Sequence, residues 1–358
     1  MDIEFESYRA VYGKCDRQGK FFVTDSKEKL EDYDGTSMDL FKGTYTMVDD
    51  VRTNCLIKKF PTDPSKLRLY SRLRKIRHHN VLSVQSFYDV SRQPRFVFSW
   101  ADGSTIAWLK AGGGGAGKMV KSSMRGRRPS PKFREIIIDI CSGLEHLFQE
   151  KIYPIKIGAE NILTCKIGNN HLTKLLVDEA EEPERVNEDI HKMKLWADVK
   201  SLMKTTFTDC ANTTTDIDPI ASKFFDAIGN LSSEKLAKYP DNWTIRQKAK
   251  YLLKIMSMDK DKVGAAVQDV GIHWPKTSKG LLNSPLREMI AYDKMREFPS
   301  KYITSYPYDF LRICKDVIKH WLVLPDSVKD ACTDWERLVE KMDTWNPEIW
   351  CILYDIFG

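Results

Sequence analysis

The chain has 358 residues, of which 42% are apolar and 30% are charged, and its formal net charge is +6. This composition is typical of a globular protein and excludes an intrinsically disordered or membrane-embedded chain. No apolar run approaches the roughly 20 residues that a membrane span requires, and the N-terminal sequence lacks the pattern of a secretory signal. We therefore expect an intracellular, cytoplasmic protein with no membrane span in this chain.

Cysteines and basic residues give weaker guidance. The eight cysteines form no C-x-x-C pair, which argues against a zinc site or a disulfide framework, and we expect most of them to be buried. Two segments are basic, since 66–77 holds six Lys and Arg residues and 118–134 holds seven. Each is either a solvated surface or a phosphate-binding patch, and the net charge alone identifies no nucleic-acid partner.

The order of the predicted elements indicates the fold class. Residues 1 to about 110 alternate short β-type runs with turn residues, and a helical pattern interrupts them at 64–77. Helical patterns dominate from Ser130, which we expect to cap a helix that has Pro131 at its first position. The sequence therefore predicts an α+β fold, in which a small β lobe with one helix precedes a helical region.

A Gly-rich and basic insertion near 111–130 lies between these regions. Its "AGGGGAGK" stretch matches most of the phosphate-binding pattern G-x-x-x-x-G-K-[ST] through Gly112, Gly117 and Lys118. Met119 follows, however, where a hydroxyl is needed to bind magnesium. We interpret the stretch as a flexible low-complexity insertion.

The stretch "IYPIKIGAENIL", 152–163, aligns without a gap to the protein-kinase catalytic-loop pattern H-R-D-L-K-P-x-N-I-L. Around it, in the expected order, lie segments that resemble the strand of the nucleotide-binding lysine, here Lys58, and the D-F-G segment, here Asp178. "WADVKSLM" resembles the helix whose aspartate, here Asp198, braces the catalytic loop. Residues 1–238 therefore resemble a protein kinase, which implies a two-lobed fold.

The departures from the kinase pattern imply a pseudokinase. Lys156 replaces the aspartate that accepts the proton of the substrate hydroxyl, so phosphoryl transfer by that route has no base. Leu69 falls where a helix glutamate should pair with Lys58, and only Gly35 matches a glycine of the nucleotide loop. No Ser, Thr or Tyr lies between Asp178 and Asp198, so that segment offers no phosphorylation acceptor.

Three residues of the kinase pattern survive, namely Lys58, Asn161 and Asp178. The resemblance implies that they could hold ATP or ADP with magnesium as a regulatory ligand. The alternative is that they satisfy buried hydrogen bonds and keep the lobes packed. The sequence leaves both roles open.

The segment "PYDFLRICKDVIKHWLVLP", 307–325, predicts an amphipathic helix with prolines at both ends. Its polar face carries Arg312, Lys315, Asp316, Lys319 and His320. Such a face suits cleavage of RNA, because histidine can protonate the leaving 5′-oxygen and the cations can stabilise the developing negative charge. RNA brings its own 2′-hydroxyl nucleophile, so no cofactor or metal is required. By composition alone, a solvated surface is the other interpretation.

This segment matches the pattern D-L-L-R-x-x-R-N-x-x-x-H of the kinase-extension nuclease family, to which the inositol-requiring enzyme and ribonuclease L belong. The resemblance implies an all-helical ribonuclease domain at 239–358 that cleaves an RNA substrate. His320 would be the general acid, and Tyr302 the general base or the residue that orients the 2′-hydroxyl. It also implies that the kinase-like domain is a dimerisation platform, in a homodimer or in a heterodimer with a related kinase or ribonuclease.

Two positions depart from the nuclease pattern. Lys315 replaces an arginine, which keeps the charge but loses the bidentate grip on phosphate. Asp316 replaces an asparagine and puts a negative charge beside an anionic substrate, although it should also favour the protonated form of His320 one turn away. We therefore expect a weakened endoribonuclease, and the alternative is a catalytically dead partner of an active relative.

Overall fold

The computed structural model describes the chain outside its N-terminal residues and several short internal segments. The described residues are 11–14, 20–46, 52–61, 64–90, 93–113, 119–123, 125–211, 217–295 and 302–358. The chain folds as two compact units. The first comprises Met1–Ile217 and Phe225–Ala237, and the second comprises Asp218–Phe224 and Lys238–Gly358. No helix among the described residues is long and apolar enough to cross a membrane.

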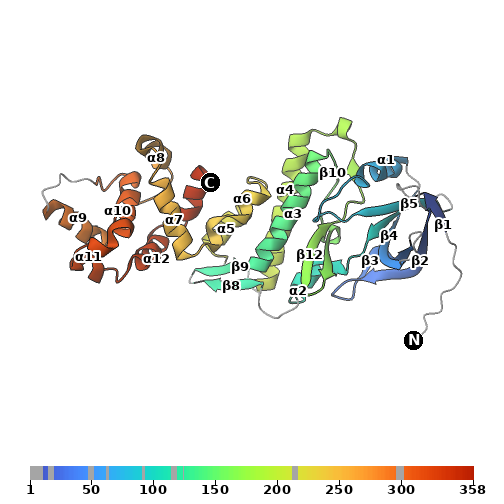
Figure 1. The fold of residues 1–358 in the computed structure, drawn as a ribbon, viewed down its shortest axis with the longest axis horizontal. Helices are drawn as coiled ribbons and strands as arrows, with labels where there is room; N and C mark the ends of the chain where they lie inside the picture. Colours follow the sequence, from blue (N-terminus) through green and yellow to red (C-terminus); the bar gives the residue numbers. More distant parts are fainter. Residues whose placement is uncertain are drawn as a thin grey trace. The chain divides into compact units, whose positions relative to one another are not determined.

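The first unit begins with an antiparallel sheet in the strand order β1-β2-β3-β4-β6-β5 (Figure 1). Its central strands β4 and β6 each bury three consecutive residues, and Ile57, Val97 and Phe98 are inaccessible to solvent. One helix, α1 (Pro64–Leu73), contacts β5. The strands are β1 (Val11–Lys14), β2 (Lys20–Glu31), β3 (Ser37–Thr46), β4 (Arg52–Lys59), β5 (Val84–Val90) and β6 (Gln93–Ser99).

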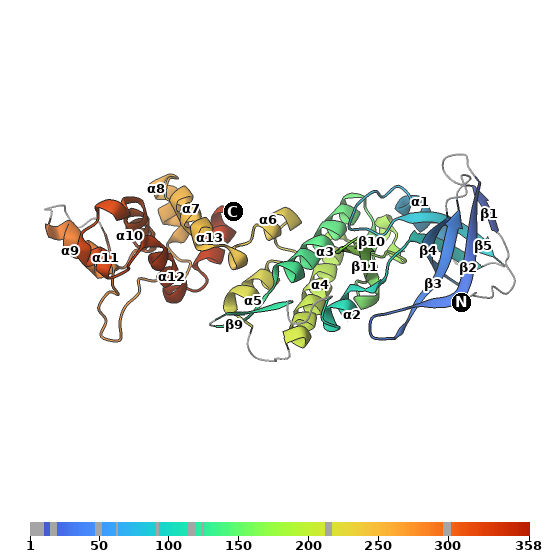
Figure 2. The same ribbon diagram turned by 60° about the horizontal axis from the view of Figure 1, so that its bottom comes forward.

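The helical part of the first unit is built on α3 (Pro131–Gln149) and α4 (Glu188–Ala211), which lie side by side in Figures 1 and 2. The hydroxyl of Ser130 accepts a hydrogen bond from Phe133 N, so the predicted helix cap is confirmed. Smaller elements surround these helices. They are β7 (Gly103–Ser104), α2 (Thr105–Lys110), β10 (Tyr153–Pro154), η1 (Ala159–Asn161), β11 (Ile162–Ile167), β12 (Asn170–Leu175), β13 (Ala180–Glu181), η2 (Pro183–Arg185) and α6 (Ser233–Ala237). The helix α5 (Pro219–Asp226) is divided between the units, since its residues up to Phe224 belong to the second.

The Gly-rich insertion is only partly described. Gly117 and Lys118 of the apparent phosphate-binding pattern lie outside the described residues. Beyond them, β8 (Val120–Ser123) and β9 (Gly126–Pro129) pair as a hairpin, so the basic part of the insertion has regular structure. A helix, α2, precedes the insertion, whereas the phosphate-binding pattern follows a strand.

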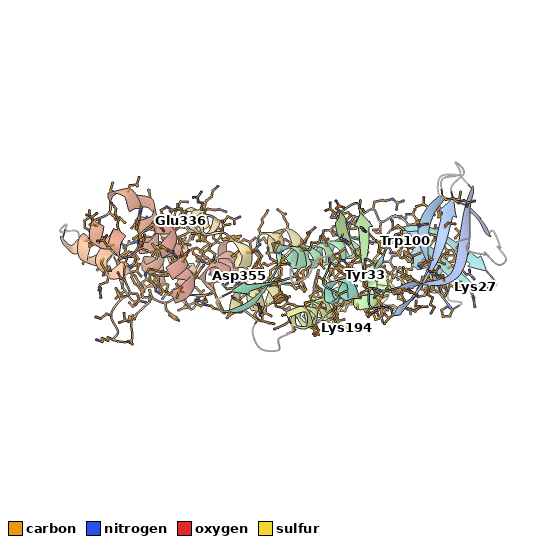
Figure 3. All side chains as sticks on the ribbon, turned by 90° about the horizontal axis from the view of Figure 1, so that it is seen from below. Lys27, Tyr33, Trp100, Lys194, Glu336 and Asp355 are labelled. Atoms are coloured by element: carbon orange, nitrogen blue, oxygen red, sulfur yellow. The ribbon has the colours of Figure 1, made fainter. Side chains whose placement is uncertain are left out.

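The second unit is helical. Its longest helix is α10 (Pro307–His320), and the predicted apolar face of this helix is buried, with Phe310, Ile313, Cys314 and Val317 inaccessible to solvent. Burial of a Phe, Ile or Val side chain contributes about 1.5–3 kcal/mol. Figure 3 labels Glu336 on α12 and Asp355 on α13. The other helices are η3 (Pro240–Asn242), α7 (Ile245–Ile255), α8 (Lys260–Val267), α9 (Leu286–Met295), η4 (Trp321–Val323), α11 (Asp326–Asp330), α12 (Trp335–Trp345) and α13 (Ile349–Phe357).

The chain thus has a β-rich lobe followed by helical structure, as its sequence predicts. The expectation for the cysteines is also confirmed where they are described. All seven described cysteines are free thiols, and six of them are buried. Cys15 lies outside the described residues.

Candidate functional site

The first unit contains a cleft with a volume of about 410 Å³. Residues of the turn between β2 and β3 line it, and in this turn Gly35 adopts a φ of +80° that favours glycine; Figure 3 labels Tyr33 from the same turn. Residues of the helical lobe line its other side, so both lobes of this unit bound the cleft. Its lining residues are Asp32, Asp34, Thr36, Ser37, Met38, Asp39, Leu40, Lys58, Ser104, Ile106, Ala107, Lys110, Ala159, Glu160, Leu176 and Asp178.

Lys58 lies between two carboxylates in this cleft. Its Nζ is 2.8 Å from Oδ2 of Asp39 on β3 and 3.5 Å from Oδ2 of Asp178. Burial opposes the charged form of Asp39, but its bond to Lys58 and the nearby Lys29 outweigh this effect and lower the pKa of Asp39. The structure thus brings together two of the residues singled out from the sequence. The ammonium charge is already compensated by the protein.

The third surviving residue, Asn161, is buried and hydrogen-bonded within the protein. Its Oδ1 accepts from Gly158 N at 3.1 Å, and its Nδ2 donates to Leu176 O at 3.3 Å. These bonds satisfy both ends of the amide, which favours the structural role over a metal ligand. Among the described residues, no group of three or more His, Cys, Asp or Glu side chains is arranged to hold a metal ion.

Lys156 occupies the position of the kinase base and remains a cation. Its Nζ bonds to Oε1 of Glu160 at 2.6 Å, and this hydrogen bond, with the charge of Glu160, raises the pKa of Lys156. Because a protonated ammonium has no lone pair, it cannot accept the proton of an attacking hydroxyl.

In the kinase pattern the helix of the sheet lobe supplies an acidic partner, whereas here α1 supplies basic residues and the segment after Asp178 supplies the acidic ones. Leu69 is buried at the position where the glutamate was expected. Instead, Lys66 of α1 lies 3.1 Å from Oε1 of Glu179, and Arg68 lies 3.0 Å from Oε1 of Glu182. At least part of the basic segment 66–77 is therefore occupied by internal ion pairs. The acidic run "DEAEEPE" was the sequence signal for these partners.

The residue expected from the sequence to contact the catalytic-loop segment 152–163 was Asp198, but a different residue of the same helix makes the hydrogen bond. His191 of α4 contacts this loop, with its Nε2 2.8 Å from the carbonyl oxygen of Pro154. No hydrogen bond from Asp198 to this loop is present in the described part of the chain. The helix was recognised from its sequence, but the residue that makes the contact was not.

The cleft is acidic. Five carboxylates line it, from Asp32, Asp34, Asp39, Glu160 and Asp178, against the two ammonium groups of Lys58 and Lys110. Since Asn161 and Lys58 are both engaged by the protein, the described side chains fit a triphosphate with its magnesium poorly. A free nucleotide anion would meet net repulsion here.

The second candidate site is the polar face of α10, formed by Arg312, Lys315, Asp316, Lys319 and His320 and called the α10 face below. The hydroxyl of Tyr302 donates to Oδ2 of Asp316 at 2.9 Å. Nζ of Lys315 lies 2.6 Å from Oδ1 of the same carboxylate. The guanidinium of Arg312 lies 4.8 Å from the centre of the Tyr302 ring. The structure therefore brings Tyr302, Lys315 and Asp316 together, and Arg312 lies beside Tyr302.

Tyr302 is suited to donate a hydrogen bond, not to remove a proton. Its side chain is buried, with 5% of the residue exposed. Burial and then the charge of Asp316 raise the pKa of Tyr302 far above its ordinary value. A phenol of this kind stays protonated near neutral pH. Of the two roles considered for Tyr302, orientation of a substrate hydroxyl therefore fits better than general base.

His320 is the last residue of α10 and is exposed to solvent. Asp316, which receives the Tyr302 hydroxyl, is one helical turn before it, so the side chains of residues 316 and 320 share one face. The adjoining Leu322 and Val323 are 88% and 74% exposed. His320 is thus accessible to a large substrate, whereas Tyr302 is almost completely buried.

No protein-family model matches the chain, and no curated protein matches it. Similar solved structures include a crystal structure of Rad53 1-466 in complex with AMP-PNP, with 14% identity over 61% of this chain and 65% of that chain, and a TM-score of 0.44. Another is the yeast RNA Pol II CTD kinase CTDK-1 complex, with 19% identity, coverage of 41% and 44%, and a TM-score of 0.30. In both cases the matched region spans less than two thirds of the length of the other protein's chain.

The kinase-like arrangement of the first unit is visible in its own elements. A β-sheet lobe with one helix precedes a helical lobe, and Lys58 of β4 faces Asp178 across the cleft between them. This order of a sheet lobe and a helical lobe is that of a protein-kinase-like fold.

Proposed function

We propose that the second unit is a metal-independent endoribonuclease that uses the α10 face. The observation that carries this proposal is the bond from the Tyr302 hydroxyl to Asp316, one turn before the exposed His320. A phenol, a histidine and two cations, Arg312 and Lys315, then border one site. This combination can orient a ribose hydroxyl, stabilise a phosphorane and protonate a leaving oxygen.

In the proposed reaction the 2′-oxygen of the RNA attacks the adjacent phosphorus. The bond from phosphorus to the 2′-oxygen forms, and the bond to the 5′-oxygen breaks. The 2′-hydroxyl proton passes to solvent, and protonated His320 gives its proton to the departing 5′-oxygen. The products are a 2′,3′-cyclic phosphate and a 5′-hydroxyl. Because the nucleophile belongs to the RNA, the reaction needs neither a metal-bound water nor a cofactor.

The first unit, in the same proposal, regulates the nuclease and transfers no phosphate. The protonated Lys156 in place of a base, together with the engaged Lys58 and Asn161, supports this role. The unit would act as a dimerisation platform in a homodimer, or in a heterodimer with a related kinase or ribonuclease. ATP or ADP with magnesium would be a regulatory ligand at most, since the cleft repels free nucleotide anions.

A second candidate function is that of a catalytically silent partner, and one observation favours it. The Asp316 carboxylate accepts from Tyr302 and is paired with Lys315, so it occupies two groups that a substrate phosphate would otherwise use. A negative charge held at this point also repels the phosphate. If this contact persists when RNA is present, the α10 face binds or cleaves RNA weakly.

The proposal is tested by incubating the purified protein with single-stranded and stem-loop RNA in the presence of EDTA. We expect cleavage to leave 2′,3′-cyclic phosphate ends and to disappear in His320→Ala. The matched control is His273→Ala, which removes another exposed histidine of the same unit. Cleavage that persists in His320→Ala would refute the assignment. Absence of cleavage by the wild type at any concentration, together with a mixed dimer, would favour the silent partner.

A further inference from the structure

Two apolar side chains just beyond α10 are left in solvent. Leu322 and Val323 belong to η4, the short helical turn that continues α10 past His320, and they are 88% and 74% exposed. No other large apolar side chain among the described residues is as exposed as either of them. Single exposed apolar residues are common on proteins, but two adjoining ones beside a candidate catalytic residue are candidates for a contact surface. Leu322 and Val323 are called the apolar pair below.

Helical spacing places the apolar pair in line with the polar side chains of the α10 face. Val323 is three residues beyond His320 and seven beyond Asp316, so it continues the column of side chains that contains both. Leu322 is likewise three residues beyond Lys319. Both columns of the face thus run from charged residues to an exposed apolar residue. The change takes place within one turn, which is a rise of about 5 Å along the helix axis.

The chain around the apolar pair is held in place. The residues on either side of it, Trp321 and Leu324, pack into the core of the second unit, and only 5% of Leu324 is exposed. Nζ of Lys329 donates to the carbonyl oxygen of Leu322 at 3.1 Å, which joins η4 to α11. Since Trp321 and Leu324 occupy the inward positions, the apolar pair is kept out of the core. A ligand that binds here needs little ordering of the protein.

The order of side chains along α10 matches the order of groups in the RNA of the proposed reaction. Arg312 and Lys315 would lie at the phosphate, and His320 at the 5′-oxygen. The 5′-oxygen belongs to the nucleotide on the 3′ side of the cleaved bond, so that nucleotide lies at the His320 end of the face. The apolar pair is the next surface beyond His320. A nucleobase has apolar faces, which leave water when they lie on Leu and Val side chains.

We propose that the apolar pair binds the base of the nucleotide on the 3′ side of the cleaved bond. This base subsite rests on the proposed nuclease function and names a part of the RNA that the site recognises. Lys319 is exposed one turn before Leu322, and Lys329 is bonded to the backbone of the pair, so both suit the phosphates of this nucleotide. Apolar side chains read no hydrogen-bonding edge. The subsite therefore takes any unpaired base and excludes a base stacked within a duplex.

The test uses an RNA that can be cleaved at one bond. All of its riboses carry 2′-O-methyl groups except the ribose on the 5′ side of that bond. In a second RNA, a tetrahydrofuran residue, which has no base, replaces the nucleotide on the 3′ side. We expect loss of the base to lower the kcat/KM of the wild type about tenfold. The loss should lie in KM, because the base is bound equally before and during the reaction.

The test variant is Leu322→Ser with Val323→Ser, and the matched control is Leu281→Ser, at a leucine of the same unit that is 55% exposed. We expect the double variant to cleave the complete RNA about tenfold less well than the wild type. It should cleave the RNA without the base as well as the wild type does, because the contact is already absent. Leu281→Ser should cleave both RNAs like the wild type.

Circular dichroism shows whether each variant remains folded, which we expect because the substituted side chains lie in solvent. If the double variant unfolds, Leu322→Ser alone should show the same pattern with a smaller loss on the complete RNA.

The outcomes separate the base subsite from the nuclease on which it rests. Equal cleavage of the two RNAs by the wild type, or equal losses on both in the double variant, would overturn the subsite and leave the nuclease in place. Equal losses together with loss of self-association in sedimentation would identify the apolar pair as a contact between two copies of the chain. A wild type that cleaves neither these RNAs nor unmodified RNA would overturn the nuclease, and the subsite with it.

Discussion

The cleft of the first unit and the α10 face of the second both contain a lysine neutralised by aspartate, but the partners differ in their distance along the chain. Lys58 is held by Asp39 and Asp178, which belong to different lobes of the first unit. Lys315 is held by Asp316, the next residue of the same helix. The first arrangement stabilises tertiary structure. The second involves only neighbouring side chains, so one substitution can release it without unfolding the unit.

The largest expected effect is that of Asp316→Asn on RNA cleavage. The amide can still accept a hydrogen bond from Tyr302, but it releases Lys315 and removes a negative charge from beside the substrate. Since each 1.36 kcal/mol in the barrier is a factor of ten, loss of this repulsion should raise kcat/KM about tenfold or more. The matched control Asp326→Asn, an exposed aspartate of the same unit, should change nothing.

A rate for Asp316→Asn equal to that of the wild type would show that the carboxylate does not restrain the α10 face. The two lysines would then differ in how they are held but not in any effect on RNA cleavage.

The next effect is on the stability of the first unit. Lys58→Met leaves Asp39 and Asp178 near each other without their shared cation. We expect a loss of about 1–2 kcal/mol in the free energy of unfolding, because Lys58 and Asp178 are mostly buried while Asp39 is exposed. Urea denaturation measures this loss, and the control is Lys75→Met, at an exposed lysine of the same unit. RNA cleavage should be unaffected, and an equal loss in the control would contradict the assigned role of Lys58.

A smaller effect should appear in the pH dependence of the stability of the first unit. His78 stacks between His79, at 4.5 Å, and His146 of α3, at 4.7 Å, and it also faces Ser142 and Lys174. Burial, followed by the charges of these two histidines, lowers the pKa of His78 to about 4. The unfolded chain, with a pKa near 6.5, therefore takes up a proton first as the pH falls.

The stability that neutral His78 contributes is thus complete above about pH 6.5 and is lost progressively towards pH 4. Because His78 is partly exposed, solvent screening reduces the loss to roughly 1 kcal/mol. Urea denaturation at pH 7, 5.5 and 4.5 should show this loss in the wild type and a flatter profile in His78→Gln. A flatter profile in His273→Gln as well would mean that the effect is not specific to the stack.

The smallest expected effect is on phosphoryl transfer. Lys156→Asp restores the carboxylate of the kinase pattern, but Lys58 and Asn161 remain engaged by the protein. We expect no transfer from labelled ATP to protein or peptide above that of the wild type. Transfer by this variant that disappears in the double variant with Lys58→Ala would show that the cleft retains a competent nucleotide site.

Local sequence patterns predicted much of the fold but little of the side-chain pairing. The periodicity of 307–325 located α10 and its buried face, and Ser130 with Pro131 located the start of α3. Both features depend on residues within one helix.

Contacts between distant segments were not predicted. The bond from Tyr302 to Asp316, the ion pair of Lys66 with Glu179 and the replacement of Asp198 by His191 as the loop contact depend on how separate segments pack. The periodicity of apolar residues within one element does not specify such contacts between elements. For α1, opposite charges in the runs 66–77 and 178–184 were a usable signal, but they did not specify which residues pair.

The segment that follows Asp178 limits how the first unit can move. Only nine residues, 179–187, precede α4, because that helix begins at Glu188. Within them, β13 pairs with β10, and Glu179 and Glu182 on either side of β13 are held by α1. Movement of this segment to a second position would therefore break the pairing of β13 with β10 and both ion pairs to α1.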